Sequence, residues 1–129
     1  MSAPVLDIVC LCAAWCGTCR EYADTFRALA AARPAHRTRW IDIEDEADLV
    51  GDIDVETFPT LMLACQGQVL FAGPVLPRLG DAQRLVDVHE AQAQAVLDGQ
   101  GAWPTLGTLG LPRDQAEAYT ALAQTVARA

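Results

Sequence analysis

The segment 14–20, Ala-Trp-Cys-Gly-Thr-Cys-Arg, constrains this chain more than any other stretch. A nearly continuous apolar run at residues 5–11 precedes it, and apolar residues at helical spacing follow it over residues 21–32. The two cysteines therefore stand at a predicted strand-to-helix junction. Two thiols separated by two residues at such a junction indicate a redox pair.

The position of each cysteine predicts its chemistry. A helix that starts near Cys16 surrounds that sulfur with backbone N–H groups that have no intrahelical partner, and the helix dipole there favours a thiolate. Cys19 lies three positions further on the same helix face, within reach of a disulfide. Gly17 keeps the turn open for a substrate backbone, and Thr18 adds little bulk. We therefore expect dithiol–disulfide exchange, in which Cys16 attacks and Cys19 resolves the mixed disulfide.

Size and charge narrow the class of protein. At 129 residues, 52% of them hydrophobic, the chain is long enough for one domain with a substantial core. No apolar run approaches the roughly 20 residues that a transmembrane helix needs. The formal net charge of −8 disfavours nucleic acid and anionic membranes as partners.

The cysteine pattern and the N-terminal run indicate the compartment. Residues 5–12 lack a preceding basic region and include Asp7, so we expect no signal peptide. Four of the five cysteines lie within residues 10–19, unlike the disulfide framework of a small secreted domain. We therefore expect a cytoplasmic protein.

The rest of the chain alternates strands and helices. Strands are predicted at four apolar segments, 4–12, 37–43, 60–65 and 69–72. After the helix at 21–32, helices are predicted at 47–50, from Asp81 to Gly99, and from Pro112 onward, with a loop at 100–110. Eight acidic residues lie between 42 and 56. They are interpreted as a solvated face, with a docking patch for a basic partner as the alternative.

The Trp-Cys-Gly-x-Cys sequence, the Pro59-Thr60 pair before a strand and Gly73 after a hairpin resemble the thioredoxin family over residues 4–98. The resemblance implies an α/β, three-layer thioredoxin-like fold. Its mixed sheet would have four strands, in the order 37–43, 4–12, 60–65, 68–72, flanked by helices.

The resemblance also implies a substrate-binding surface. Pro59 would be cis and face the redox pair, and the backbone of Phe58 would pair with an incoming substrate strand. Trp15, just before the first cysteine, would line the groove, and Gly73 would lie close to it. Together with Gly17 and Thr18, these residues form the predicted binding site.

By this resemblance we expect the family's opening strand and helix to be absent, because the sequence begins at the strand that carries the motif. The strand at 37–43 then becomes an edge with unpaired backbone groups. We expect a thioredoxin-like domain at residues 1–98, with residues 99–129 forming a loop-and-helix extension packed on the same domain. The extension would cover that edge, or a second subunit would pair with it to form a homodimer.

The chain also departs from the family near the thiols. Thioredoxins keep a buried acid six residues before the nucleophile and a buried lysine near it, where this chain has Cys10 and Trp40. Deprotonation of Cys19 must then rely on water or another group. Gly-Thr stands between the cysteines where thioredoxins have Gly-Pro.

Cys10 and Cys12 add two further thiols, which a strand points to one face. The resemblance implies that this face lies beneath the redox pair. They are interpreted as buried apolar side chains, with exchange between one of them and Cys19 as an alternative. A four-thiolate zinc or iron–sulfur site is disfavoured, because the spacing does not match common zinc sites and two of the cysteines lie on a strand. Cys65 is expected to be a partly exposed bystander.

These observations predict a thiol–disulfide oxidoreductase that needs no cofactor or metal. Its expected partners are a protein or small disulfide substrate and a reductase or small thiol that recycles it. The alternative is a non-turnover thioredoxin-like module that binds or assembles a partner protein. The missing acid and lysine favour that alternative, whereas the intact Cys-x-x-Cys argues against it.

Overall fold

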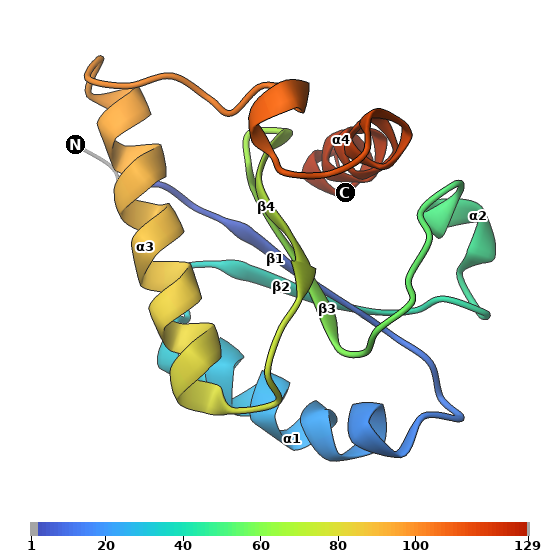
Figure 1. The fold of residues 1–129 in the computed structure, drawn as a ribbon. Helices are drawn as coiled ribbons and strands as arrows, with labels where there is room; N and C mark the ends of the chain where they lie inside the picture. Colours follow the sequence, from blue (N-terminus) through green and yellow to red (C-terminus); the bar gives the residue numbers. More distant parts are fainter. Residues whose placement is uncertain (1–2, 129) are drawn as a thin grey trace.

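The computed structural model describes residues 3–128 and places a four-stranded sheet between two layers of helices (Figure 1). The strands are β1 (Asp7–Cys12), β2 (Arg37–Asp42), β3 (Thr60–Cys65) and β4 (Gln68–Pro74). The helices are α1 (Gly17–Ala32), α2 (Ala47–Val50), α3 (Leu79–Leu97) and α4 (Arg113–Ala127), with a 3₁₀ turn at Leu106–Thr108.

The sheet has the predicted order, β2-β1-β3-β4. β1 pairs with β2 in parallel through the α1 crossover, while β1–β3 and β3–β4 are antiparallel. In this register Cys12 lies opposite Asp42, and Leu11 lies opposite Thr60. The end of β1, the end of β2 and the start of β3 therefore lie at the same end of the sheet. The chain enters the Cys-x-x-Cys turn there.

β1 is buried on both faces, as its unbroken apolar sequence predicts. Ile8, Cys10 and Cys12 belong to the cluster on one side of the sheet, and Val9 and Leu11 belong to the cluster on the other. Both faces of this strand must therefore be covered by helices.

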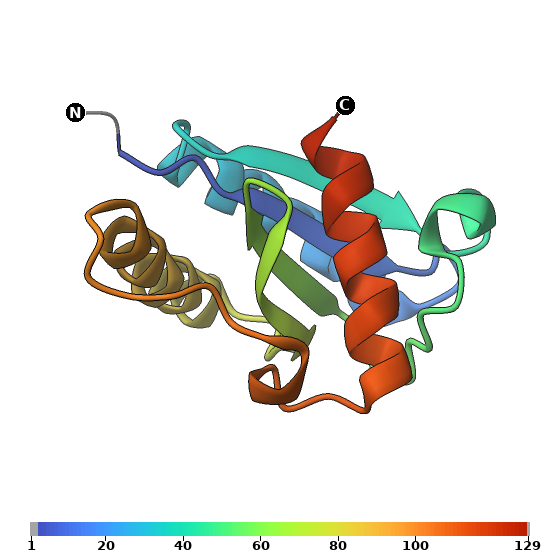
Figure 2. The ribbon, with the colours of Figure 1, turned by 90° about the horizontal axis from the view of Figure 1, so that it is seen from above.

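Two pairs of helices cover the two faces, as Figures 1 and 2 show. α1 and α3 bury apolar residues such as Tyr22, Leu29 and Val86 against the first face. α4 lies against β4, β3 and β1 on the second face, where Leu122 and Ala123 enter the cluster, and α2 lies beside it.

The helix of the C-terminal extension covers a face of the sheet, so the expectation that it covers the 37–43 edge is wrong. Its apolar stripe needs a broad apolar surface, which the exposed edge of β2 does not offer. α4 does reach the start of β2, because Arg37 donates a hydrogen bond from Nη2 to the Val126 carbonyl at 2.7 Å. β2 remains an edge strand of the sheet.

Several predicted elements differ from those in the structure. β4 continues through Gly73 to Pro74, at its pairing with Thr60. α3 begins at Leu79, which places Asp81 in its first turn, where a carboxylate favours the positive end of the helix dipole. The predicted loop at 100–110 contains the 3₁₀ turn, which a reciprocal pair of hydrogen bonds between Thr105 and Thr108 caps.

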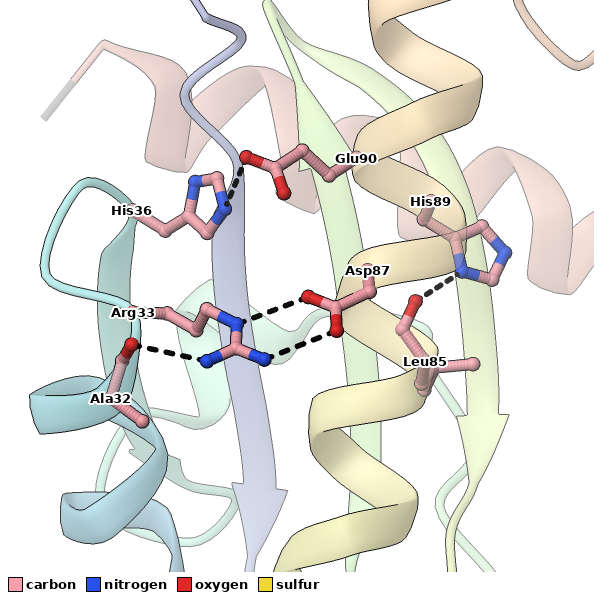
Figure 3. A network of polar contacts seen from close by, with 7 residues as sticks. All are labelled: Ala32, Arg33, His36, Leu85, Asp87, His89 and Glu90. Atoms are coloured by element: carbon pink, nitrogen blue, oxygen red, sulfur yellow. Dashed lines mark hydrogen bonds and ion pairs between the residues drawn. The ribbon is translucent and has the colours of Figure 1, made fainter.

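Polar contacts join α1 and the start of β1 to α3, away from the cysteine turn (Figure 3). Arg33 donates from Nε and Nη2 to the two carboxylate oxygens of Asp87, at 3.0 and 3.1 Å. The buried His36 accepts a hydrogen bond from the Leu6 amide at Nδ1, at 3.1 Å, and its Nε2 lies 3.3 Å from Glu90 Oε1. These contacts connect the end of α1 and the segment before β2 to α3.

The helices are amphipathic, with polar residues on their outer faces. Within residues 3–128, no helix is both long enough and apolar enough to cross a bilayer.

The position of α4 predicts a stability effect. Replacing the buried Leu122 by alanine removes apolar contacts with the sheet and leaves a cavity, so Leu122→Ala lowers the free energy of unfolding by about 2–5 kcal/mol. Urea denaturation measures this difference. The exposed neighbour Gln124, replaced by alanine, serves as the control and changes it by less than about 0.5 kcal/mol. Equal stability of the two variants would contradict the packing of α4 on the sheet.

Candidate active site

α1 begins at Gly17, and Cys16 is its N-cap residue with an extended backbone (φ −85°, ψ 122°). The Cys16 carbonyl accepts the Arg20 amide at 3.1 Å, while no side chain caps the helix and its first turn holds no acidic residue. Cys16 itself is a half-buried free thiol. Its sulfur therefore stands at a helix terminus whose dipole favours a negative charge.

Cys19 lies in the first turn of α1 and forms a disulfide with Cys12 at the end of β1. The Cα atoms of the two residues are 5.7 Å apart, within the usual range for a disulfide. Both side chains are buried, at 0% and 1% exposure. The structure thus pairs Cys19 with the auxiliary cysteine Cys12, and the Cys16–Cys19 disulfide stays a prediction.

Cys10 lies two residues before Cys12 on the same face of β1, and their Sγ atoms are 3.9 Å apart. Burial raises the pKa of the Cys10 thiol to about 12, so Cys10 stays protonated at neutral pH. The Tyr22 hydroxyl is buried in the same cluster, and burial together with Cys10 raises its pKa to about 12. Four sulfurs, three of them buried, therefore meet at the junction of β1 and α1.

The fifth cysteine differs from its prediction. Cys65 is buried at the end of β3, at 1% exposure, so the expectation that it is partly exposed is wrong. It belongs to the cluster beneath α1 and α3, because β3 is buried along its whole length. Burial raises the pKa of its thiol, with a further contribution from Asp7.

Asp42 holds the turn that precedes Cys16 by hydrogen bonds. Its place among the acidic residues between 42 and 56, interpreted as a solvated face, did not indicate this role. Its Oδ2 accepts the Ala14 amide at 2.9 Å, and its Oδ1 accepts the amides of Glu44 and Asp45 at 2.9 and 3.1 Å. The hydrogen bonds from Glu44 and Asp45, and then that from Ala14, hold the pKa of this carboxyl below its usual range. The parallel register, which places Asp42 opposite Cys12, brings it to the turn.

An aromatic pair flanks the free thiol in sequence and space. Trp15, 62% exposed, contacts the Phe58 ring edge-to-face with ring centroids 5.6 Å apart. The Trp15 indole donates from Nε1 to Glu44 Oε1 at 2.5 Å. The structure thereby joins two of the predicted binding residues, from β1's turn and from the segment before β3, into one partly exposed surface beside Cys16.

The other predicted binding residues lie as follows. The Phe58–Pro59 peptide bond is cis, and the Pro59 carbonyl accepts the Val75 amide at 3.1 Å. Gly17 and Thr18 are exposed in the first turn of α1. Gly73, in β4, lies opposite Leu61 of β3. It lines a cleft of about 360 Å³, whose other wall is formed by the start of α4.

The positions at which the family resemblance placed an acid and a lysine are occupied by apolar packing. Cys10 lies opposite Trp40 in the register of β1 and β2, and Trp40 contacts Phe26 with ring centroids 5.8 Å apart. Among residues 3–128, no group of three or more His, Cys, Asp or Glu side chains is arranged to hold a metal ion.

Comparison with known proteins identifies the family of the chain. The family model "Thioredoxin" matches residues 3–74, which is more than half of the chain. The chain belongs to the thioredoxin family. The matched segment runs from the start of β1 to the end of β4, so α3 and α4 lie beyond it.

Relatives of the thioredoxin family show how far the likeness extends. A protein of Streptomyces coelicolor named "Putative thioredoxin 2" is 32% identical over 96 residues, which cover 64% of this chain and 72% of that protein. The X-ray structure of Fasciola hepatica thioredoxin has a TM-score of 0.60 at 22% identity, covering 67% of this chain and 82% of that one. The crystal structure of thioredoxin from Trypanosoma brucei brucei has a TM-score of 0.57 at 24% identity, covering 68% of this chain and 78% of that one. The two structural likenesses concern the fold.

The Asp42 contacts predict a pH effect on stability. Because the pKa of Asp42 is lowered in the folded protein, its carboxylate stabilises the fold above the ordinary aspartate pKa, and this stabilisation is lost as the pH falls through the lowered value. Asp42→Asn therefore lowers the urea midpoint at pH about 6, and its difference from wild type shrinks at pH about 3. Asp52→Asn, which removes an exposed carboxylate, is the matched control. A deficit of Asp42→Asn that is the same at both pH values would refute the role of the Asp42 charge.

Proposed function

We propose that this thioredoxin-family protein catalyses thiol–disulfide exchange, with Cys16 as the nucleophile and Cys19 as the resolving thiol. The observation that carries the proposal is the free, half-buried Cys16 thiol at the N-cap of α1, next to the exposed Trp15, which contacts the half-buried Phe58. A thiolate is the attacking species in such exchange, and a helix N-terminus stabilises it.

The proposed reaction begins with both active thiols reduced. The Cys16 thiolate attacks one sulfur of a substrate disulfide, the substrate S–S bond breaks, and the other substrate sulfur leaves as a thiolate. Cys19 then loses its proton and attacks Cys16 Sγ, which releases the second substrate thiol and leaves a Cys16–Cys19 disulfide. An external thiol or a reductase returns the protein to its dithiol form.

Trp15 and Phe58 supply the proposed docking surface for a protein substrate. Their edge-to-face contact exposes apolar area next to the attacking sulfur, and Asp42 holds the turn between them and α1. The backbone of Phe58 would pair with an extended segment of the substrate.

The proposal extends to compartment and partners. The clustering of the cysteines favours a reducing, cytoplasmic compartment, where small thiols or a reductase supply electrons. β2 is an edge strand of the sheet and offers a pairing surface for a second copy of the chain. Size-exclusion chromatography with light scattering measures the resulting mass.

Insulin reduction by dithiothreitol tests the catalytic proposal. Wild-type protein accelerates insulin precipitation, whereas Cys16→Ser gives the rate of dithiothreitol alone, because the serine hydroxyl does not attack a disulfide. Cys65→Ser, which alters a buried cysteine at the far end of the cluster, keeps the wild-type rate. Equal rates for wild type and Cys16→Ser would favour the alternative, a module that binds a partner without turnover.

The aromatic pair predicts a substrate-size effect. Trp15→Ala removes exposed aromatic area from the docking surface and lowers kcat/KM for insulin about two- to tenfold, since an aromatic contact with the substrate contributes about 0.5–1.5 kcal/mol. For 2-hydroxyethyl disulfide, which is too small to cover the pair, kcat/KM stays within about twofold of wild type. Val88→Ala, at an exposed apolar position on α3, is the control. Equal losses for both substrates would show that Trp15 acts on the thiol and not on docking.

A further inference from the structure

We propose that Cys12 is a second disulfide partner of Cys19. When the disulfide moves from Cys16–Cys19 to Cys12–Cys19, Cys16 becomes a free thiol again, while Cys19 is no longer available to resolve a mixed disulfide. The inference rests on the proposed function and extends it to the oxidised protein. The Cys12–Cys19 disulfide is called the inner disulfide below, and the Cys16–Cys19 disulfide the outer one.

The geometry that carries the proposal is the meeting of β1 and α1. Cys12 is the last residue of β1, and Cys19 lies in the first turn of α1, which packs on the same face of the sheet. Their Cα atoms are 5.7 Å apart and they form the inner disulfide, which leaves Cys16 as a free thiol at the surface. Cys19 is therefore within bonding distance of a cysteine that lies outside the Cys-x-x-Cys motif.

The exchange balances without an external oxidant. The Cys12 thiolate attacks Cys19 Sγ of the outer disulfide, the bond between Cys16 and Cys19 breaks, and a bond between Cys12 and Cys19 forms. Cys16 departs as a thiolate and takes up, directly or through solvent, the proton that Cys12 has lost. The protein holds one disulfide before and after, so no net oxidation occurs.

Burial and charge favour the inner disulfide. The leaving sulfur, Cys16, returns to the N-cap of α1, where the helix dipole stabilises a thiolate. The two sulfurs that remain bonded, Cys12 and Cys19, lie in the apolar cluster, where an ionised thiol is costly. Cys10 donates its S–H toward Cys12 Sγ at 3.9 Å and, being a thiol of raised pKa, stays a protonated bystander.

The inner disulfide changes what Cys16 does next. With Cys19 bonded to Cys12, a mixed disulfide at Cys16 has no resolving thiol and persists until an external thiol attacks it. Because Cys12 and Cys19 are almost fully buried, an external thiol reaches the inner disulfide only through the reverse exchange with Cys16. The oxidised protein would therefore hold a disulfide substrate covalently, whereas the reduced protein releases it.

Excess 2-hydroxyethyl disulfide tests the inference on the full chain. The reduced wild-type protein ends with one internal disulfide and one hydroxyethylthio group on Cys16, because Cys16 is free again once the inner disulfide has formed. Cys12→Ser ends with the outer disulfide and no adduct. Cys10→Ser, a change on the same strand face, behaves like wild type. Intact-mass spectrometry after an acid quench counts the adducts.

Peptide mapping identifies the bonded pair. Trypsin leaves Cys10, Cys12, Cys16 and Cys19 on one peptide, because the first basic residue is Arg20. Chymotrypsin cleaves after Trp15 and separates Cys12 from Cys16 and Cys19. The inner disulfide then keeps the two fragments joined, whereas the outer disulfide stays within one fragment.

The outcomes separate this inference from the proposed function. Joined fragments and a full equivalent of adduct in wild type, with neither in Cys12→Ser, support the inner disulfide whether or not insulin is reduced. An unmodified wild-type protein with only the outer disulfide overturns the inference and leaves the insulin result to decide the proposed function. Equal amounts of adduct per protein in wild type and Cys12→Ser also overturn the inference, because Cys16 would then be free even when Cys12 is absent.

Discussion

The burial of β1 on both faces is the constraint on which the rest of the structure depends. A strand without a solvated face needs helices on each side, and α1 with α3 supplies one cover while α4 with α2 supplies the other. The same strand ends in Cys12 and delivers the chain into the Cys16 turn. Stability and thiol chemistry therefore depend on one segment, because the cysteines of β1 and those of the Cys-x-x-Cys motif all lie within residues 10–19.

The register of the sheet assembles the site from separate parts of the chain. Pairing of Cys12 with Asp42 brings the acidic segment after β2 to the turn, where Asp42 holds Ala14 and Glu44 holds Trp15. Pairing of Leu11 with Thr60 brings Phe58 and Pro59 to the same end. Cys16 is thus presented on a turn that is fixed from two sides.

The family resemblance predicted the strand order. The local pattern predicted a buried first strand and a helix that starts near Cys16, because the apolar run and the Cys-x-x-Cys spacing are signals within a few residues. The local pattern did not predict where α4 packs, because an apolar stripe on a helix does not specify the surface against which the helix packs. Asp42 was missed because nothing local distinguishes it from its acidic neighbours. Strand alternation placed Cys10 and Cys12 on one face, and the family resemblance placed that face beneath the site. The bond from Cys12 to Cys19 depends on how closely α1 approaches β1, which is a tertiary distance.

The central claim is that Cys16 is the sulfur that attacks a substrate, and trapping tests it most directly. A Cys19→Ser protein mixed with a disulfide-bonded protein substrate should accumulate a covalent complex, because the mixed disulfide at Cys16 has lost its resolving thiol. Mass spectrometry of that complex should find the substrate joined to Cys16, and dithiothreitol should release it. A complex joined through another cysteine, or no complex at all, would contradict the account.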